Sequence, residues 1–254
     1  MMSALAALIH LQAHLVAREF RLRYRRSVLG WLWAFVQPLT RLAIFTFVFT
    51  RVIPLGIDNY PVFLFSGIIA WTWFSNGIIS ATTSPLALRY LLFQPIRRFI
   101  VPTVSVASDS IDFVLAFPIL LAFAVIAGGR LEWSLLFVPV IMVVQFALVV
   151  GLGALFATAH VWVRDVQKVI EVFLALGFYI TPVFYQPDQI PEGFRWMAEL
   201  NPMAHLIAAY RVVIIEGVLP DLAGFSVVAL LSGAIAALGY LVYGRFSASF
   251  VDEL

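Results

Sequence analysis

Six apolar stretches divide the chain, and each is long enough, or nearly so, to cross a lipid bilayer. They cover residues 32–52, 62–84, 104–127, 135–161, 169–184 and 222–243, and a membrane-spanning helix needs about 20 mainly apolar residues. Charged residues make up only 12% of the 254-residue chain, against about 25% in a typical soluble domain. The sequence therefore predicts one all-α polytopic membrane domain over residues 1–254, with six transmembrane helices.

The segment before the first stretch is rich in arginine. Residues 1–27 read "MMSALAALIHLQAHLVAREFRLRYRRS", an apolar half followed by five arginines. The apolar half is too short and too polar to cross about 30 Å of hydrocarbon, so we expect an amphipathic helix in the membrane interface, where arginines reach the phosphates of membrane lipids. A cleaved signal peptide has the reverse order of charge and apolar chain. The apolar chain that follows excludes a nucleic-acid partner.

The basic residues also predict the orientation, because lysine and arginine near span ends favour the cytoplasm. With a cytoplasmic N-terminus, the inner segments hold Arg18, Arg21, Arg23, Arg25, Arg26, Arg89, Arg97, Arg98, Arg164, Lys168 and Arg245. The outer segments hold fewer, namely Arg51, Arg130, Arg195 and Arg211. We therefore expect both termini on the cytoplasmic side.

The long segment between the last two stretches, residues 185–221, predicts a helical hairpin on the outer side of the membrane. Its two apolar parts, residues 192–200 and 203–217, are each too short to span. Asn201 and Pro202 separate them, and this pair is typical of a helix start, with asparagine as the cap and proline in the first turn. We expect the hairpin to dip partly back into the outer leaflet.

Several kinds of chemistry are missing from the sequence. A phosphate-binding P-loop has the pattern GxxxxGK[ST], but the only lysine is Lys168, in "VQKV". There is no cysteine, and His10 and His14 lack the glutamate of an HExxH zinc site. No GxSxG nucleophile motif occurs. We therefore expect that the chain is not an enzyme, that it holds no cofactor, and that any ATP driving it is hydrolysed by a separate polypeptide.

Arg41, Asp109 and Asp112 lie inside apolar stretches, where a charge is costly and usually functional. Arg41 is expected to face protein, water or a headgroup. Asp109 and Asp112 are three residues apart and share one helix face. They fit either a proton-coupling pair or a structural role, as helix-start residues favoured by the helix dipole or as ion-pair partners of a nearby arginine, and their position close after Pro102 favours the structural role.

Aromatic residues make up 15% of the chain, and the tryptophans near span ends are typical of interfacial belts. Other rings fit a path for sugars, because aromatic faces bind the apolar faces of sugar rings, provided that neighbouring spans bring them together. The candidates for this substrate path are Arg41, Tyr60, Trp71, Phe74, Tyr179 and Tyr185.

Three motifs carry a resemblance to a known family. They are "REFRLRYRRSVLGWLWAFVQPL" at residues 18–39, "TPVFYQPDQIP" at residues 181–191 and "LNPMAHLIAAYR" at residues 200–211. In this order and spacing the whole chain resembles the membrane subunits of ABC type-2 exporters, in the branch that moves O-antigen, capsular polysaccharide and teichoic acid across the bacterial inner membrane.

The resemblance implies a homodimer of six-span subunits that binds two copies of a P-loop ATPase subunit, which would hold the ATP and magnesium. The substrate would be a lipid-linked glycan, exported between the two subunits. The N-terminal helix and the loops at residues 88–102 and 163–168 would transmit ATPase closure, with coupling candidates Arg18, Arg21, Tyr24, Arg25, Arg89, Arg97, Arg98, Arg164 and Asp165. The outer hairpin would form a gate, with candidates Pro191, Trp196, Asn201, Pro202 and Arg211.

Two other functions remain open on the sequence. A proton-coupled secondary transporter would use Asp109 and Asp112 and would need no ATPase. A membrane-embedded glycosyltransferase or acyltransferase would turn over without a partner.

Overall fold

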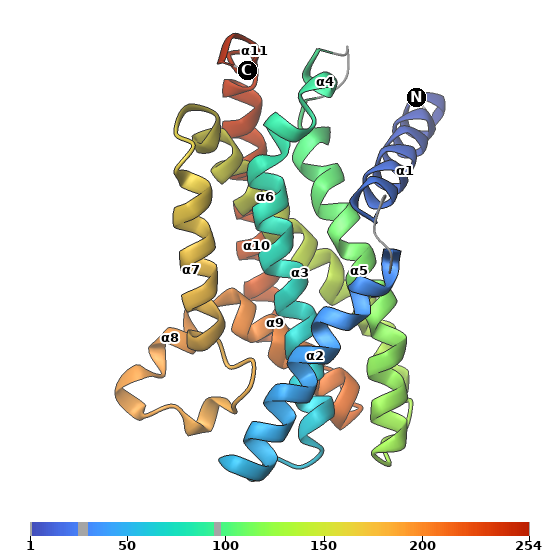
Figure 1. Ribbon diagram of the computed structural model, residues 1–254, viewed down its shortest axis with the longest axis vertical. Helices are drawn as coiled ribbons and strands as arrows, with labels where there is room; N and C mark the ends of the chain where they lie inside the picture. Colours follow the sequence, from blue (N-terminus) through green and yellow to red (C-terminus); the bar gives the residue numbers. More distant parts are fainter. Residues whose placement is uncertain (1, 25–29, 94–97, 254) are drawn as a thin grey trace.

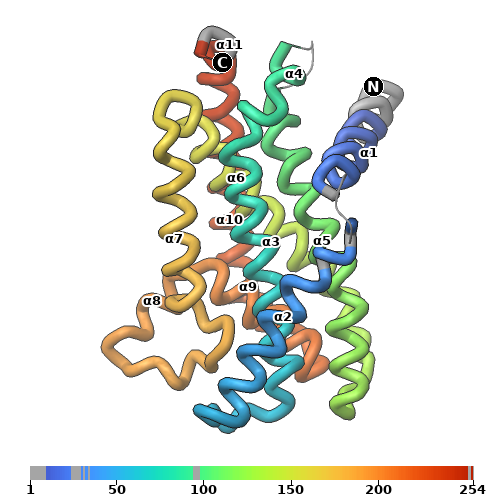
Figure 2. Tube along the Cα trace, in the orientation of Figure 1, coloured from blue at the N-terminus to red at the C-terminus, as the bar shows by residue number. Residues whose placement is uncertain are grey.

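The structure is a computed structural model that describes residues 2–24, 30–93 and 98–253. Within these ranges the chain forms helices and turns and no β-strand (Figures 1 and 2). Four segments are long and apolar enough to cross a membrane: α3 (Tyr60–Ala87), α5 (Ile100–Ile126), Trp133–Trp162, which includes α6 (Val138–Trp162), and α10 (Leu222–Phe246). They match four of the six expected stretches.

Helix α3 lies at the centre of the bundle. Its most apolar 18-residue window is 78% buried, whereas that of α10 is 17% buried. Since both helices are apolar on all sides, the difference is one of position, and the exposed face of α10 is suited to lipid. The buried core around α3 includes large side chains such as Phe65, Ile68 and Ile78.

The other two expected stretches form shorter helices. α2 (Trp33–Phe47) has 15 residues and continues into a π-helical turn, Val48–Val52. α7 (Val166–Ile180) also has 15 residues, and Ile170 is its one buried residue. The expected helix at residues 169–184 is wrong at its C-terminal end, because Thr181 is extended, with ψ of 136°. A residue that precedes a proline is disfavoured in the helical region, and here the proline is Pro182.

The remaining elements gather at the two ends of the bundle. α1 (Met2–Tyr24) lies beside α5, and its N-terminal part shares one end of the molecule with α4 (Arg89–Leu92), the α6–α7 turn and α11 (Phe250–Glu253) (Figure 1). We call this the α1 end. The opposite part, the α8 end, carries α8 (Trp196–Glu199) and the nearby α9 (Pro202–Arg211), which continues into a π-helical turn, Val212–Glu216.

Candidate functional site

At the α1 end, an apolar cluster joins α1 to the bundle. Leu15 of α1 is buried there with Leu91 and Leu92 of α4. Beside it, Arg18 Nη1 donates a hydrogen bond of 2.6 Å to the Tyr90 hydroxyl, and the Arg18 guanidinium carbon lies 4.7 Å from the centre of the Tyr90 ring. Burial raises the pKa of Tyr90, so its hydroxyl stays neutral at physiological pH. Arg18 therefore links α1 to the loop that carries α4.

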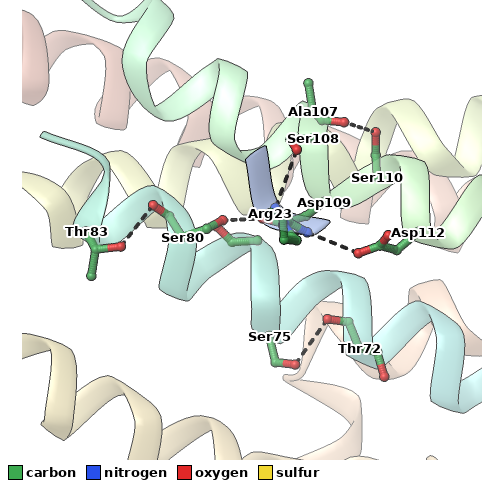
Figure 3. A network of polar contacts seen from close by, with 11 residues as sticks. Arg23, Thr72, Ser75, Ser80, Thr83, Ala107, Ser108, Asp109, Ser110 and Asp112 are labelled. Atoms are coloured by element: carbon green, nitrogen blue, oxygen red, sulfur yellow. Dashed lines mark hydrogen bonds and ion pairs between the residues drawn. The ribbon is translucent and has the colours of Figure 1, made fainter. Parts of the chain in front are cut away.

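A second arginine of α1 reaches into the bundle. Arg23 Nη1 lies 2.6 Å from an Asp109 carboxylate oxygen and 3.0 Å from one of Asp112, and Arg23 Nη2 donates to Ser108 Oγ at 3.4 Å (Figure 3). The Ser80 hydroxyl of α3 donates to the other oxygen of Asp109. The interpretation of the two aspartates as ion-pair partners of a nearby arginine is confirmed, whereas the helix-start interpretation is wrong, because α5 begins at Ile100 and has no acidic residue in its first turn. We call these residues the Arg23 network.

The other coupling candidates are placed as follows. Arg98 Nη1 donates to the backbone oxygen of Ser247 at 2.6 Å, which ties the loop to the end of α10. Arg21 donates within α1 to the Ala17 carbonyl. Arg25 and Arg97, together with the Tyr24 side chain, lie outside what the structure describes, while exposed positions are occupied by Arg89, Arg164 and Asp165.

Between α2, α3 and α7 lies a cleft of about 380 Å³, which we call the polar cleft. Arg41 lines it from α2 and Glu171 from α7, where Lys168 and Gln167 hold the Glu171 carboxylate at 3.1 and 2.7 Å. Its wall on α3 includes Trp71, Ser75 and Asn76. A second, mostly apolar cleft of about 710 Å³ lies on another side of α7, against α3 and α6. α7 thus lies between two clefts, and little of its surface packs against the other helices.

Five of the six substrate-path candidates are aromatic, and the structure brings them together. Trp71 lies 5.2 Å from Phe74 and 6.1 Å from Phe178, measured between ring centres. Phe178 and Phe184 continue the series of rings to Tyr179 and Tyr185, and Phe49 connects it to Tyr60. Arg41, Trp71 and Tyr179 line the polar cleft, Phe74 lines the apolar cleft, and Tyr185 lines a third one nearer α8. Tyr60 is buried, and its hydroxyl donates to the Phe184 carbonyl.

Near the α8 end, the Asn201 side chain makes two hydrogen bonds. Its side-chain oxygen accepts from the Met203 amide at 2.9 Å, and Pro202 is the first residue of α9, so the expected helix start is confirmed. Its amide nitrogen donates to Thr181 Oγ1 at 2.8 Å. Asn201 thereby joins the start of α9 to the end of α7.

Arg211 makes the second connection between these segments. Its side chain is 7% exposed and donates to the carbonyls of Pro182 at 2.7 Å and Val183 at 2.6 Å. Its guanidinium carbon lies 3.5 Å from the centre of the Phe63 ring on α3. The sequence placed Arg211 among the basic residues of the outer segments, whereas the structure buries it in the bundle. Of the other gate candidates, Pro191 and Trp196 are exposed.

Some residues of these sites were missed by the sequence reasoning. Asn76 and Glu171 are polar residues within apolar stretches, which is the signal that could have found them. Thr181 and Arg23 gave no such signal, since the first is a small residue beside a proline and the second is one of several neighbouring arginines.

The chain matches the family model described as ABC-2 type transporter over residues 12–215. The chain belongs to the ABC-2 type transporter family. As a member of this transporter family it is a transport component, and the motifs at residues 181–191 and 200–211 are the segments that Asn201 and Arg211 hold together.

Curated ABC-2 relatives are similar over most of their length. An O-antigen export system permease protein RfbA of Myxococcus xanthus is 34% identical over 82% of this chain and 81% of the relative. An RfbA of Klebsiella pneumoniae is 28% identical over 93% of this chain and 92% of the relative. The polysialic acid transport protein KpsM of Escherichia coli is 23% identical over 90% of both chains.

Proposed function

We propose that this protein is the channel-forming membrane subunit of an ATP-driven exporter that moves a lipid-linked polysaccharide across the bacterial inner membrane. The observation that carries the proposal is the similarity, over most of both chains, to permeases named for O-antigen export. A relative named for polysialic acid transport is matched over 90% of both chains. The shared class of cargo would be a polysaccharide.

In this proposal α2 and α7 are spans as well, which gives six crossings and places both termini in the cytoplasm. The helical run from the turn at Gly30–Leu32 through α2 to Val52 supports α2 as a span, because its 23 residues would rise about 34 Å. The position of α1 and α11 at one end of the molecule supports an even number of crossings (Figure 1).

A second copy of the chain would face the polar cleft and enclose the path between the two subunits. The cleft contains Arg41 and Glu171, and a charged residue at membrane depth is expected to face protein or water. Its aromatic wall, including Trp71 and Tyr179, offers faces for sugar rings. The arginines of the α1 end would attract the phosphates of a lipid carrier.

A separate ATPase, in two copies, would dock at the α1 end and supply the ATP and magnesium sites. The absence of a P-loop from the sequence supports this division of labour. Its contact surface would include α1, α4 and the α6–α7 turn with Arg164 and Asp165. The outer hairpin at residues 185–221 would act as the gate at the other side of the membrane.

Blocking the polar cleft tests this proposal. The chain contains no cysteine, so Asn76→Cys creates a single thiol at a position that lines the cleft. Modification with a bulky thiol reagent is expected to reduce the polysaccharide at the cell surface by about tenfold or more, because the reagent occupies the path. The measurement is surface polysaccharide against the amount retained inside the cell.

The matched control is Leu230→Cys, which places the thiol on α10, where the leucine is 75% exposed. The same reagent should leave export through this variant unchanged. Equal export from modified Asn76→Cys and modified Leu230→Cys cells would contradict a path through the cleft.

A further inference from the structure

We propose that Arg23 is a positioning residue that pins α1 to α3 and α5, so that movement of α1 reaches the wall of the polar cleft directly. The inference rests on the proposed function, in which α1 receives the movement of the ATPase. It concerns the Arg23 network at the junction of α1, α3 and α5 (Figure 3).

Because Asp109 is buried, its ion pair with Arg23 restricts the position of α1. Its side chain is 3% exposed, while Arg23 is 31% exposed and reaches it from outside the bundle. A buried carboxylate that loses its cation is strongly unfavourable, because neither water nor another charge replaces the lost partner. α1 therefore cannot shift away from α5 without breaking its ion pair with Asp109, so the two helices are held together at this point.

Two other contacts of α1 restrict its direction of movement less. Leu11, Leu15 and Val16 of α1 meet an apolar cluster, and hydrophobic contact has no preferred geometry in the plane of the surface. The Arg18–Tyr90 contact is exposed, and exposed polar contacts of this kind contribute little. The ion pair of Arg23 with Asp109 combines charge, direction and burial.

From Asp109 the contacts continue to α3. The Ser80 hydroxyl donates to Asp109, and Ser80 lies four residues, or one helical turn, after Asn76. Asn76 lines a small cavity of about 20 Å³ together with Asp109 and Asp112, and it also lines the polar cleft. The same asparagine thus borders the Arg23 network on one side and the proposed path on the other.

The first measurement is the position of α1 in the purified chain alone. Spin labels on Ala13→Cys in α1 and Val114→Cys in α5 are possible because both positions are exposed and the chain contains no other cysteine. Arg23→Gln is expected to broaden the distance distribution between the labels and shift it to longer values. Asp109→Asn should have a smaller effect of the same kind, and adding it to Arg23→Gln should have little further effect, since one interaction has already been removed.

The second measurement is export per ATP hydrolysed in the complex with the ATPase. Arg23→Gln is expected to lower this ratio about five- to tenfold while ATP hydrolysis continues, because Arg23 transmits movement rather than driving it. His14→Gln on α1 and Ser110→Ala on α5 are the matched controls. His14 is exposed, and Ser110 donates a hydrogen bond within its own helix to the Ala107 carbonyl, so both variants should behave as wild type.

Two results would overturn the proposal that Arg23 holds α1 in place against α3 and α5. One is a wild-type label distance in Arg23→Gln, and the other is a changed distance with unchanged export per ATP. Failure of the proposed function looks different. The wild type itself would then show no ATP-dependent export, while Arg23→Gln would still change the label distance in the purified chain.

Discussion

Arg211→Met is expected to destabilise the protein by about 3–5 kcal/mol, because the substitution leaves buried carbonyl groups without their charged donor. Arg211 donates to Pro182 and Val183 and stacks on Phe63, so one side chain joins α9, the end of α7 and α3. Arg211→Lys should recover part of the loss, since a lysine keeps the charge but has neither the planar fork of donors nor the flat face that stacks. The measurement is the free energy of unfolding of the purified chain in detergent.

Arg195→Met is the matched control for this prediction. Arg195 lies in the same hairpin, is exposed, and makes a bond of 3.4 Å to the Ile190 carbonyl, so its loss should change stability by about 0.5 kcal/mol or less. Gly67→Ala is expected to disturb the same contact from the side of α3 and so to lower stability. A Cβ at this position would lie 2.9 Å from Arg211 Nη2 and 2.8 Å from the Val183 oxygen. A wild-type stability for both Arg211→Met and Gly67→Ala would contradict the role assigned to Arg211.

Gly239→Val is expected to separate α10 from α6 and to cost about 3 kcal/mol or more. A Cβ at Gly239 would lie 2.5 Å from the Gly151 oxygen, and one at Gly151 would lie 2.6 Å from the Ala236 nitrogen. These neighbours are backbone atoms, so they cannot move aside as the end of a flexible side chain could. Hydrogen exchange of the α6 and α10 amides, together with the unfolding free energy, measures the effect.

Gly233→Val separates packing from helix propensity. Gly233 lies in the same helix, but nothing stands within 4 Å of its Cβ position. Both substitutions change the intrinsic helix preference equally, so the difference between the two variants reports the contact alone. Equal stabilities of Gly239→Val and Gly233→Val would show that the close approach of α6 and α10 is unimportant.

Hydrophobic patterning predicted the main elements of the fold. Four of the six expected stretches coincide with the four membrane-length helices, because an apolar run of this length has few alternatives to a helix in lipid. The start of α9 was predicted from Asn201 and Pro202, since capping depends on residues that are adjacent in the sequence. The end of α7 was missed although Pro182 indicates it.

Less of the candidate site than of the fold could be predicted from the sequence. The aromatic candidates could be named, but their grouping around Phe178 and Phe184 depends on how α2, α3 and α7 pack. Arg211 was counted among the basic residues of the outer segments, and its burial could not be foreseen because its partners are backbone carbonyls, which leave no trace in the sequence. Arg23 could not be distinguished from its neighbours, because only the direction of its side chain from α1 selects it.

The Arg23 network also bears on the rival function. A proton-coupling carboxylate must be free to exchange its proton during the cycle, whereas a carboxylate held at ion-pair distance by an arginine already has a partner at that position. Arg23 lies within ion-pair distance of both aspartates. This arrangement favours a structural role for the pair over proton transfer, and it leaves ATP hydrolysis by a partner as the energy source in our proposal.

Transport into sealed vesicles decides between the two energy sources. The chain and its ATPase are reconstituted with the cytoplasmic side outward, lipid-linked polysaccharide is added outside, and the protected fraction is measured with ATP or with a proton gradient. We expect uptake that requires both proteins and hydrolysable ATP and that is indifferent to the gradient. Uptake by the chain alone, driven by the gradient and lost in the Asp109→Asn, Asp112→Asn double variant, would contradict the account.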